Sequence, residues 1–375
     1  MTGLFFAAAA VFIGGFLLEK RTALQDRSRL AHVIHVNGTR GKSSVSRLIE
    51  AGLRAGGLRV YCKTTGTLPM TIDVAGNETL IRRAAPSNIR EQLRILHKAA
   101  AQGAEVLVAE CMAITPKLQS VAQHEMLRAD IGVITNVRID HTDVMGETLE
   151  EICNCLCSTV PVGGTLFTAE TALRERMRQN AEAQNCRFFA VEPKGDEPDF
   201  DFGENIALAL AVCQHLGVDR ETALSGMAAY HPDPYALSFY RLGGVHFVNA
   251  LSANDIQSTR MIYRQVLSTL PRSPQRTVLL VNNRMDRGSR TRSMAELACT
   301  LSSDEVWLLG SGQDYFLRTL RRGGYRGPVT KLKSAGDADF AALPDHTLVF
   351  AAGNIAGEGK NLLARVEEEG ERLVR

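Results

Sequence analysis

The chain is predicted to be an α/β protein with two domains, each built on a parallel β-sheet, preceded by a membrane-anchor helix. Short apolar runs alternate with segments of helical spacing, which is the pattern of a parallel sheet covered by helices. At 375 residues the chain is long for a single domain. Its first 18 residues carry no charge, which sets them apart from the rest.

An uncharged and mostly apolar segment extends from Leu4 to Leu18. Its length is near the lower limit for crossing a bilayer. Its apolarity on all sides argues against the alternative of a buried or amphipathic helix. Positive charges follow it at Lys20, Arg21, Arg27 and Arg29. By the positive-inside rule, we expect residues 1–19 to form a single-pass anchor in the cell membrane, with the domains in the cytoplasm.

The first domain is expected over residues 30–231, with strands and helices in alternation. Apolar runs predict strands near residues 32–36, 59–63, 105–110 and 130–135. Apolar residues at helical spacing predict helices near residues 43–56, 88–102, 147–160 and 204–216. Ser87 is the expected N-cap of the second of these helices.

Pro232 and Pro234 interrupt the chain and predict a domain boundary near residues 231–235. Beyond it, apolar runs at 278–281, 306–309 and 348–351 again alternate with helical segments. We therefore expect a smaller, Rossmann-like α/β domain over residues 236–375, with a core of its own.

The net charge and the positions of the cysteines indicate which classes of protein to expect. The net charge of +2 offers no basis for nucleic-acid binding. The eight cysteines lie mostly in apolar segments, as expected of reduced core thiols in the cytosol. Cys153, Cys155 and Cys157 suggest a metal cluster at first sight. Residues two apart on a helix do not share a face, and no CxxC pair completes a zinc site, so we interpret them as packing residues.

The segment from Asn37 to Ser44 (NGTRGKSS) lies between an apolar strand and a helical pattern. A glycine loop in this position directs backbone N–H groups and a helix N-terminus towards an anion. Lys42 adds positive charge, and Ser43 offers a hydroxyl to magnesium. The loop is shorter than the common phosphate-binding loop, whose first glycine would stand at residue 36. In this chain the first glycine is Gly38. A glycine-rich turn without phosphate is the alternative.

Polar groups follow the other predicted strands. Glu110 ends one strand, where a carboxylate opposite a phosphate loop would hold magnesium, and an exposed strand-end glutamate is the alternative. Asp140, His141 and Asp143 follow the next strand, and a structural histidine is the alternative there. Thr65 follows the strand near residues 59–63.

The short loop resembles the ATP loop of the Mur ligase superfamily. The segments HVNGTRGKSS, KTTGT, AECMAI, GVITNVRIDHTDVMG and VNALSANDIQST together resemble the ligase subunit of poly-γ-glutamate synthases (the PgsB or CapB type), from about Leu30 onwards. The resemblance implies an ATP-dependent amide ligase. It would extend poly-γ-glutamate with glutamate through an acyl phosphate, using Mg²⁺ and working with small membrane subunits.

The resemblance also implies roles for particular residues. ATP would be bound by Asn37, Gly38, Thr39, Arg40, Gly41, Lys42, Ser43 and Ser44. Catalysis would depend on Lys42, Glu110 and His141, and the metal would be held by Ser43, Thr65, Glu110 and His141.

Further candidates for ATP binding lie in the second domain. Asn254 and Asp255 resemble part of a loop that meets the nucleotide, and helix capping is the alternative. Arg284 and Asp286 follow a buried strand, and a solvated charged loop is the alternative.

Arg82 and Arg83, with Asn88, form a basic patch in the first domain and are candidates for holding an acidic substrate.

Two departures separate this chain from folate and peptidoglycan ligases. Leu156 stands where many of those enzymes carry a carbamylated lysine, so the magnesium site would lack that ligand. Pro234 is followed by Tyr235 rather than by the Gly-Arg of those enzymes.

Two other functions are kept as alternatives. One is a folylpolyglutamate or Mur-like ligase. The other is a non-ligating ATPase subunit of a polymer exporter. The Asp140-His141 pair and the two-domain plan favour ligation.

Overall fold

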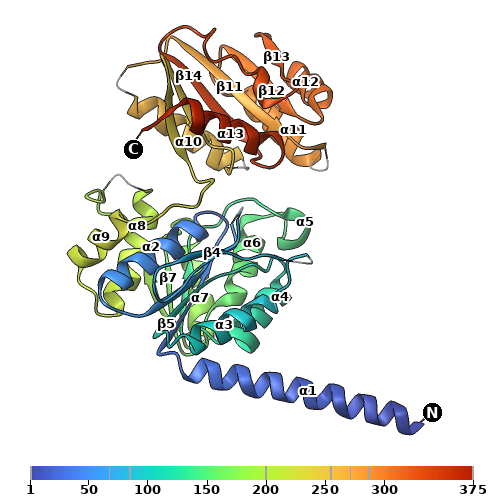
Figure 1. The fold of residues 1–375 in the computed structure, drawn as a ribbon, viewed down its shortest axis with the longest axis vertical. Coiled ribbons are helices and arrows are strands. Elements are labelled where there is room, and N and C mark those ends of the chain that lie inside the picture. Colours follow the sequence, from blue (N-terminus) through green and yellow to red (C-terminus); the bar gives the residue numbers. More distant parts are fainter. Residues whose placement is uncertain are drawn as a thin grey trace. The chain divides into compact units, whose positions relative to one another are not determined.

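The computed structural model describes residues 2–66, 68–83, 86–198, 201–253, 256–270, 272–285 and 288–373. The chain divides into two compact units, Met1–Asp233 and Pro234–Arg375 (Figure 1). The division falls inside the proline-containing segment 231–235. Each unit has its own sheet and is described separately.

The first unit contains an eight-stranded sheet of order β4-β3-β2-β5-β1-β6-β7-β8. The strands are β1 (His32–Asn37), β2 (Val60–Lys63), β3 (Met70–Ile72), β4 (Glu78–Leu80), β5 (Val106–Glu110), β6 (Ile131–Ile134), β7 (Thr165–Thr168) and β8 (Arg187–Ala190). All pair in parallel except β3 and β4, which form an antiparallel edge beside β2. The predicted parallel sheet is therefore confirmed.

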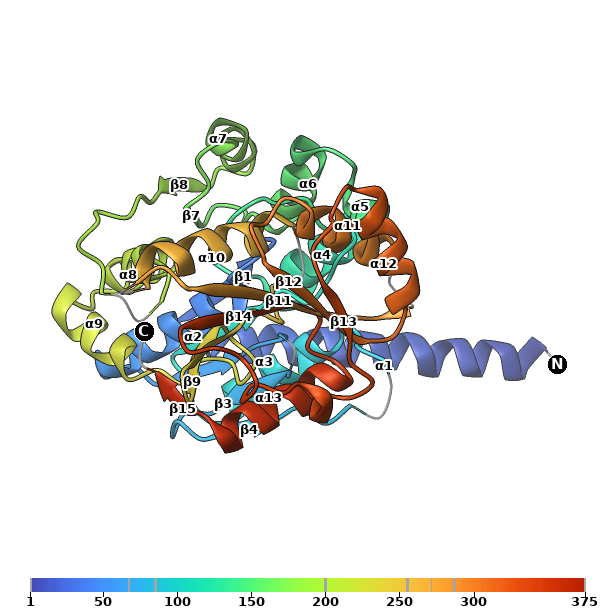
Figure 2. The same cartoon turned by 90° about the horizontal axis from the view of Figure 1, so that it is seen from above.

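Helices cover both faces of this sheet (Figure 2). The helices of this unit are α1 (Thr2–Ser28), which extends away from the sheet (Figure 1), α2 (Lys42–Ala55), α3 (Glu91–Ala101), α4 (Pro116–Val121), the π-helix η1 (Ala122–Leu127), α5 (Thr142–Met145), α6 (Leu149–Leu156), the 3₁₀ turn η2 (Cys157–Thr159), α7 (Arg174–Ala183), α8 (Gly203–His215) and α9 (Arg220–Ala228).

Successive residues of a strand point to opposite faces of this sheet. Ile34 and Val36 of β1 pack with α2, α8 and α9, whereas Val33 packs on the opposite face with α3. Cys153, Cys155 and Cys157 are buried in a third cluster with α7, which confirms that they are packing residues.

The α3 helix begins later than predicted. Its first residue is Glu91, and Arg90 occupies the N-cap. The backbone N–H of Arg90 donates to Asn88 Oδ1 at 2.9 Å. Ser87 is therefore not the cap, because this local turn around Asn88 delays the first helical residue.

The anchor predicted over residues 1–19 falls in α1, a helix of 27 residues. Polar contacts join its C-terminal part to the rest of the unit, with Asp26 Oδ2 hydrogen-bonded to His97 Nδ1 of α3 at 2.9 Å and Arg27 Nη2 2.8 Å from Asp130 Oδ1 just before β6. Among the helices in the described ranges, none combines the length and the apolarity needed to cross a membrane.

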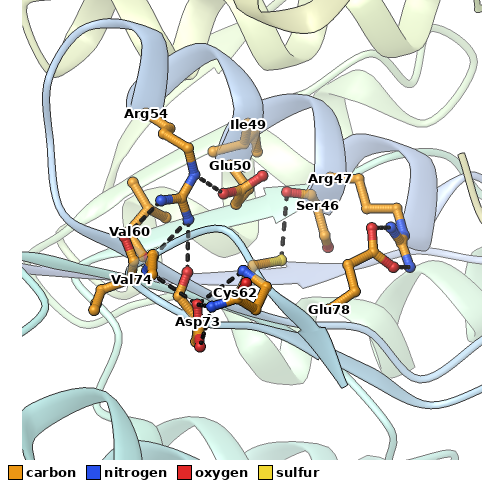
Figure 3. A network of polar contacts seen from close by, with 12 residues as sticks. Ser46, Arg47, Ile49, Glu50, Arg54, Val60, Cys62, Asp73, Val74 and Glu78 are labelled. Carbon is orange, nitrogen blue, oxygen red and sulfur yellow. Dashed lines mark hydrogen bonds and ion pairs between the residues drawn. The ribbon is translucent and has the colours of Figure 1, made fainter. Parts of the chain in front are cut away.

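Two arginines of α2 hold the helix against neighbouring segments through hydrogen bonds (Figure 3). Arg54 Nη1 donates to Val74 O at 2.7 Å, Arg54 Nη2 donates to Asp73 O at 2.8 Å, and Arg54 Nε donates to Glu50 Oε1 at 2.5 Å. Burial raises the pKa of Glu50, although the charge of Arg54 opposes this. This end of α2 is therefore held by polar contacts as well as by its apolar face.

Arg47 acts in the same way nearer the start of α2. Its side chain is buried, and Nη1 donates both to Glu78 Oε1 at 2.7 Å and to His231 O at 2.9 Å. Arg47 thus ties α2 to β4 and to the last residues of the first unit, which fixes the direction in which the start of α2 points.

The second unit contains a seven-stranded sheet of order β13-β12-β11-β14-β10-β9-β15. The strands are β9 (Ser238–Leu242), β10 (Val245–Asn249), β11 (Arg276–Asn283), β12 (Glu305–Gly310), β13 (Val329–Lys331), β14 (Thr347–Gly353) and β15 (Glu371–Leu373). The β9 strand pairs antiparallel with both β10 and β15 at one edge, and the remaining neighbours pair in parallel.

The helices of this unit are α10 (Ile256–Thr269), α11 (Gly288–Ala298), α12 (Gln313–Arg322), the 3₁₀ turn η4 (Ala335–Asp337) and α13 (Glu358–Glu369). The α10, α11 and α12 helices cover one face of the sheet and α13 covers the other (Figure 2). Leu362 and Val366 of α13 belong to the same buried cluster as Val278 and Leu280 of β11.

Close packing of α2 against α9 leads to a stability prediction. A Cβ on Gly226 would lie 2.5 Å from the backbone oxygen of Ala51. Gly226→Ala should destabilise the protein by about 1–3 kcal/mol, because this clash with backbone exceeds the helix-propensity gain of about 1 kcal/mol. Chemical denaturation measures the free energy of unfolding. Ser225→Ala, at an exposed position of the same helix, is the control, and equal stability of the two variants would contradict the packing argument.

Candidate active site

The predicted phosphate loop lies between β1 and α2 and depends on two glycines. Gly38 has φ of 127° and Gly41 has φ of 78°, which are conformations that other residues rarely adopt. A Cβ on Gly38 would also lie 2.0 Å from Thr135 Oγ1. No side chain fits there, so glycine at residue 38 is required by the neighbouring strand as well as by the turn.

The segment after β6 holds the loop in shape. Thr135 Oγ1 donates to Arg40 O at 2.6 Å, and Asn136 both donates to Arg40 O and accepts from Arg40 N, each at 3.1 Å. Arg138 N donates to Thr39 Oγ1 at 3.0 Å. The sequence analysis missed the roles of Thr135 and Asn136. Their position directly after the strand next to β1 was the available signal.

The base of the loop is fixed from the other side. Asn37 is buried, and its Nδ2 donates to Gln119 Oε1 at 2.7 Å and to Thr159 Oγ1 at 3.1 Å. Asn205, in the first turn of α8, lies against the other glycine, with its Oδ1 2.8 Å from the position of a Cβ on Gly41. Asn205 was also missed, since nothing in its local sequence indicates that α8 reaches the loop.

The Lys42 ammonium lies inside the loop that precedes it. Nζ donates to Gly38 O at 2.7 Å and to Thr39 O at 3.2 Å. Burial lowers the pKa of Lys42, and the charge of Glu110 partly offsets the effect. Because Gly41 at the N-cap has no side chain, the N–H groups of Lys42, Ser43 and Ser44 at the start of α2 remain for an anion.

Glu110 brings three of the predicted metal-binding residues together. Its buried carboxylate oxygen Oε2 accepts from Ser43 Oγ at 2.9 Å and from the Thr65 backbone N at 2.6 Å. Hydroxyl and carboxylate oxygens are the ligands that Mg²⁺ and other hard cations prefer. The donor set of Ser43 and Glu110 therefore fits a divalent cation next to the phosphate loop.

Asp233 lies beside the same group, although the sequence analysis did not select it. A Cβ on Gly66 would be 2.8 Å from Asp233 Oδ2 and 2.9 Å from Ser43 Oγ. The last residue of the first unit thus places a carboxylate close to the Ser43 hydroxyl.

His141 lies in a separate position. It has φ of 45°, and its Nε2 is 3.9 Å from Asp140 Oδ2, which in turn is 3.0 Å from Arg40 Nη2. Within the described ranges, no three His, Cys, Asp or Glu side chains gather as a metal cluster. The structure thus groups Ser43, Thr65 and Glu110, while His141 lies near the phosphate loop beside Asp140.

A cavity of about 240 Å³ lies between the phosphate loop and the residue His141. Its walls include residues of the phosphate loop, the segment from Cys111 to Ile114 after β5, His141, Arg83 and Leu156. Leu156 is buried, so an apolar side chain occupies this part of the wall. Three cations, Arg40, Lys42 and Arg83, face one carboxylate, that of Asp140, among the charged residues of the wall. The cavity suits a negatively charged ligand.

The remaining predicted residues are placed as follows. Arg82, Arg83 and Asn88 are all exposed. Arg83 belongs to the cavity wall, whereas Arg82 and Asn88 do not. Arg284 follows β11 in the second unit, beside a small cavity with Asn282 and Asn283. Asn254, Asp255 and Asp286 lie outside the described residues.

Each of the two units matches a known protein family. Residues 36–210 match the Mur ligase middle domain, and residues 234–369 match the poly-gamma-glutamate synthase CapB C-terminal domain. The chain is 31% identical over 389 aligned positions to the PGA synthase CapB of Bacillus subtilis (strain 168), which covers 97% of each protein. It is 37% identical over 275 positions to the capsule biosynthesis protein CapB of Bacillus anthracis, covering 70% of this chain and 59% of that protein.

A solved structure shares the fold. It is a bifunctional folylpolyglutamate synthase/dihydrofolate synthase with Mn, AMPPNP and L-glutamate bound, with a TM-score of 0.66 and 15% identity, covering 92% of this chain and 93% of that chain. The architecture is therefore the α/β fold of Mur ligases. Because the B. subtilis comparison extends over nearly the whole chain and each unit matches its own family, this chain belongs to the CapB family of poly-γ-glutamate synthases, which are ATP-dependent amide ligases.

Proposed function

We propose that the first unit activates a γ-carboxylate of glutamate as a γ-glutamyl phosphate, and that an amine of glutamate then displaces the phosphate to extend poly-γ-glutamate. The observation that carries this proposal is the phosphate loop, in which Lys42 lines a cationic cavity while the next residue, Ser43, donates to Glu110. A cavity of this charge accommodates both the phosphates of ATP and an acidic substrate.

Activation is needed because a free carboxylate is a poor electrophile. A nucleophile would have to expel oxide from a group that is already negative. Transfer of the γ-phosphoryl group of ATP gives a mixed anhydride whose leaving group is phosphate, so the products are ADP and phosphate. Lys42 and the first N–H groups of α2 bind the phosphates and stabilise the charge that develops during the transfer.

Ser43 and Glu110 would hold the divalent cation, which we propose to be Mg²⁺. When bound, the metal neutralises phosphate charge and polarises the transferred group. The folylpolyglutamate synthase of the same fold holds Mn, AMPPNP and L-glutamate, which supports a metal, a nucleotide and glutamate as ligands of this chain.

We further propose that the protein works at the cytoplasmic face of the cell membrane, together with small membrane subunits. Support comes from α1, on which Phe12 is 78% exposed, Phe16 58% and Leu18 66%. Large apolar side chains exposed on one helix are typical of a surface that contacts lipid or another protein. Lys20 and Arg21 follow them and suit an anionic membrane surface.

Replacement of Lys42 tests the acyl-phosphate route. With hydroxylamine and glutamate, the wild type should form a γ-hydroxamate and release ADP and phosphate. Lys42→Ala should lower this rate about a hundredfold or more, because the transferring phosphoryl group loses its cation. Exposed Lys117→Ala is the control. Release of AMP, or a Lys42→Ala rate within a few-fold of the wild type, would exclude the mechanism.

Replacement of His141 tests how the metal is held without a carbamylated lysine. Activity should not depend on bicarbonate, since Leu156 cannot form a carbamate. His141→Ala should lose activity at low magnesium and recover part of it at high magnesium, as measured by magnesium titration of hydroxamate formation. His346, in the second unit, also has a positive φ, so His346→Ala controls for the backbone. A carbamylated lysine found by mass spectrometry in the site would contradict this account.

Deletion of residues 1–18 tests the membrane attachment. The truncated protein should move from the membrane fraction to the soluble fraction after cell lysis and centrifugation, because its exposed apolar segment is gone. Purified truncated protein should keep its ATP binding, as the phosphate loop lies outside the deletion. Membrane association equal to that of the full chain would refute the proposal.

A further inference from the structure

A charged network of Arg83, Glu91 and Lys63 reaches the same cavity as the phosphate loop through Arg83. Arg83 Nε and Nη2 donate to the two carboxylate oxygens of Glu91, at 2.7 and 2.9 Å. Lys63 Nζ is 3.3 Å from Glu91 Oε1. Lys63 is 0% exposed and Glu91 is 5% exposed, while Arg83 is the member that reaches the cavity wall.

Burial and charge pairing act in opposite directions on the pKa of both buried members of the network. Burial lowers the pKa of Lys63, and the charge of Glu91 opposes that shift. Burial acts to raise the pKa of Glu91, but the hydrogen bond from Arg83 and the charges of Lys63 and Arg83 outweigh it and lower the pKa. One carboxylate is thus shared by two cations, and truncating Glu91 would leave the buried Lys63 without the carboxylate that pairs with it.

The geometry leaves one side of the Arg83 guanidinium for a ligand. Glu91 takes the edge formed by Nε and Nη2, and the structure gives Nη1 no partner among the described residues. A guanidinium can bind a second carboxylate through its free edge. Since Arg83 lines the same cavity as the phosphate loop, that carboxylate would belong to the substrate.

The proposed reaction identifies which carboxylate this is. The γ-carboxylate of glutamate must lie at the phosphate loop, whereas the α-carboxylate stays free in γ-linked glutamate. We infer that Glu91, held by buried Lys63, positions Arg83 to bind the α-carboxylate of the glutamyl substrate, so that this network selects glutamate over amino acids without that group. The inference rests on the proposed ligase function.

A purely structural role for the network is the competing explanation. The start of α3 carries Gln92 as well as Glu91, and Gln92 Nε2 donates to Glu110 O at 3.1 Å. A structural role would lower stability or total activity without changing the choice of substrate. Substrate selectivity therefore separates the two explanations.

The experiment compares glutamate with 4-aminobutyrate, which has the same reacting carboxylate and amine but no α-carboxylate. ATP-dependent hydroxamate formation is measured with each substrate for the full chain and for Arg83→Ala, Arg83→Lys and Glu91→Gln. Arg94→Ala, an exposed arginine on α3 outside the cavity, is the matched control.

Arg83→Ala should raise KM for glutamate about ten- to a hundredfold and leave KM for ATP roughly unchanged. It should also remove most of the preference for glutamate over 4-aminobutyrate. Arg83→Lys should keep part of this preference because the charge remains, and Glu91→Gln should behave like a weaker form of Arg83→Ala. If Glu91→Gln does not fold, as judged by circular dichroism, the two Arg83 variants decide the result.

Three results would overturn the inference. A folded Arg83→Ala protein that keeps the wild-type preference for glutamate excludes Arg83 as the α-carboxylate ligand. An equal rise of KM for ATP and glutamate shows a general disturbance of the site. A wild-type protein that forms no hydroxamate from glutamate overturns the proposed function itself, and the inference falls with it.

Discussion

The close approach of the phosphate loop to the end of the neighbouring strand is the constraint on which the site depends. Gly38 passes so near Thr135 that no Cβ fits between them, and the loop carbonyl of Arg40 is held by hydrogen bonds from the same segment. This contact exists only because β1 and β6 are parallel neighbours. It fixes the loop, and the loop in turn fixes Lys42 and the start of α2.

The order of strands explains why chemically active groups meet at one edge. The strands β2, β5, β1 and β6 lie side by side and run in parallel, so their C-terminal ends open on the same crevice. Each strand end contributes different polar or charged groups to the site. Lys63 and Thr65 come from β2, Glu110 from β5, the phosphate loop from β1, and the segment with Thr135 from β6. Anions are thus attracted to this edge, while Glu110 and Glu91 offset part of its positive charge.

Two residues far apart in the chain set the chemical character of the site next to the phosphate loop. Leu156 is buried in the cavity wall and offers no ligand to a metal, whereas Asp233 brings a carboxylate close to Ser43 from the end of the unit. Arg47 holds that last segment through the carbonyl of His231. The oxygen-rich side of the site therefore depends on the last residues of the first unit.

Local patterns in the sequence were enough to predict the parallel sheets, the glycine loop and the position of Glu110 at a strand end, because strand and helix periodicity and turn chemistry act over a few residues. The start of α3 was misplaced, since a turn at Asn88 competes with the cap expected from Ser87. The roles of Thr135, Asn205 and Asp233, and the pairing of Lys63 and Arg83 through Glu91, were decided only by the tertiary structure. These contacts join residues far apart in the chain, and only strand order and the seating of α2, α3 and α8 on the sheet bring them within hydrogen-bonding distance.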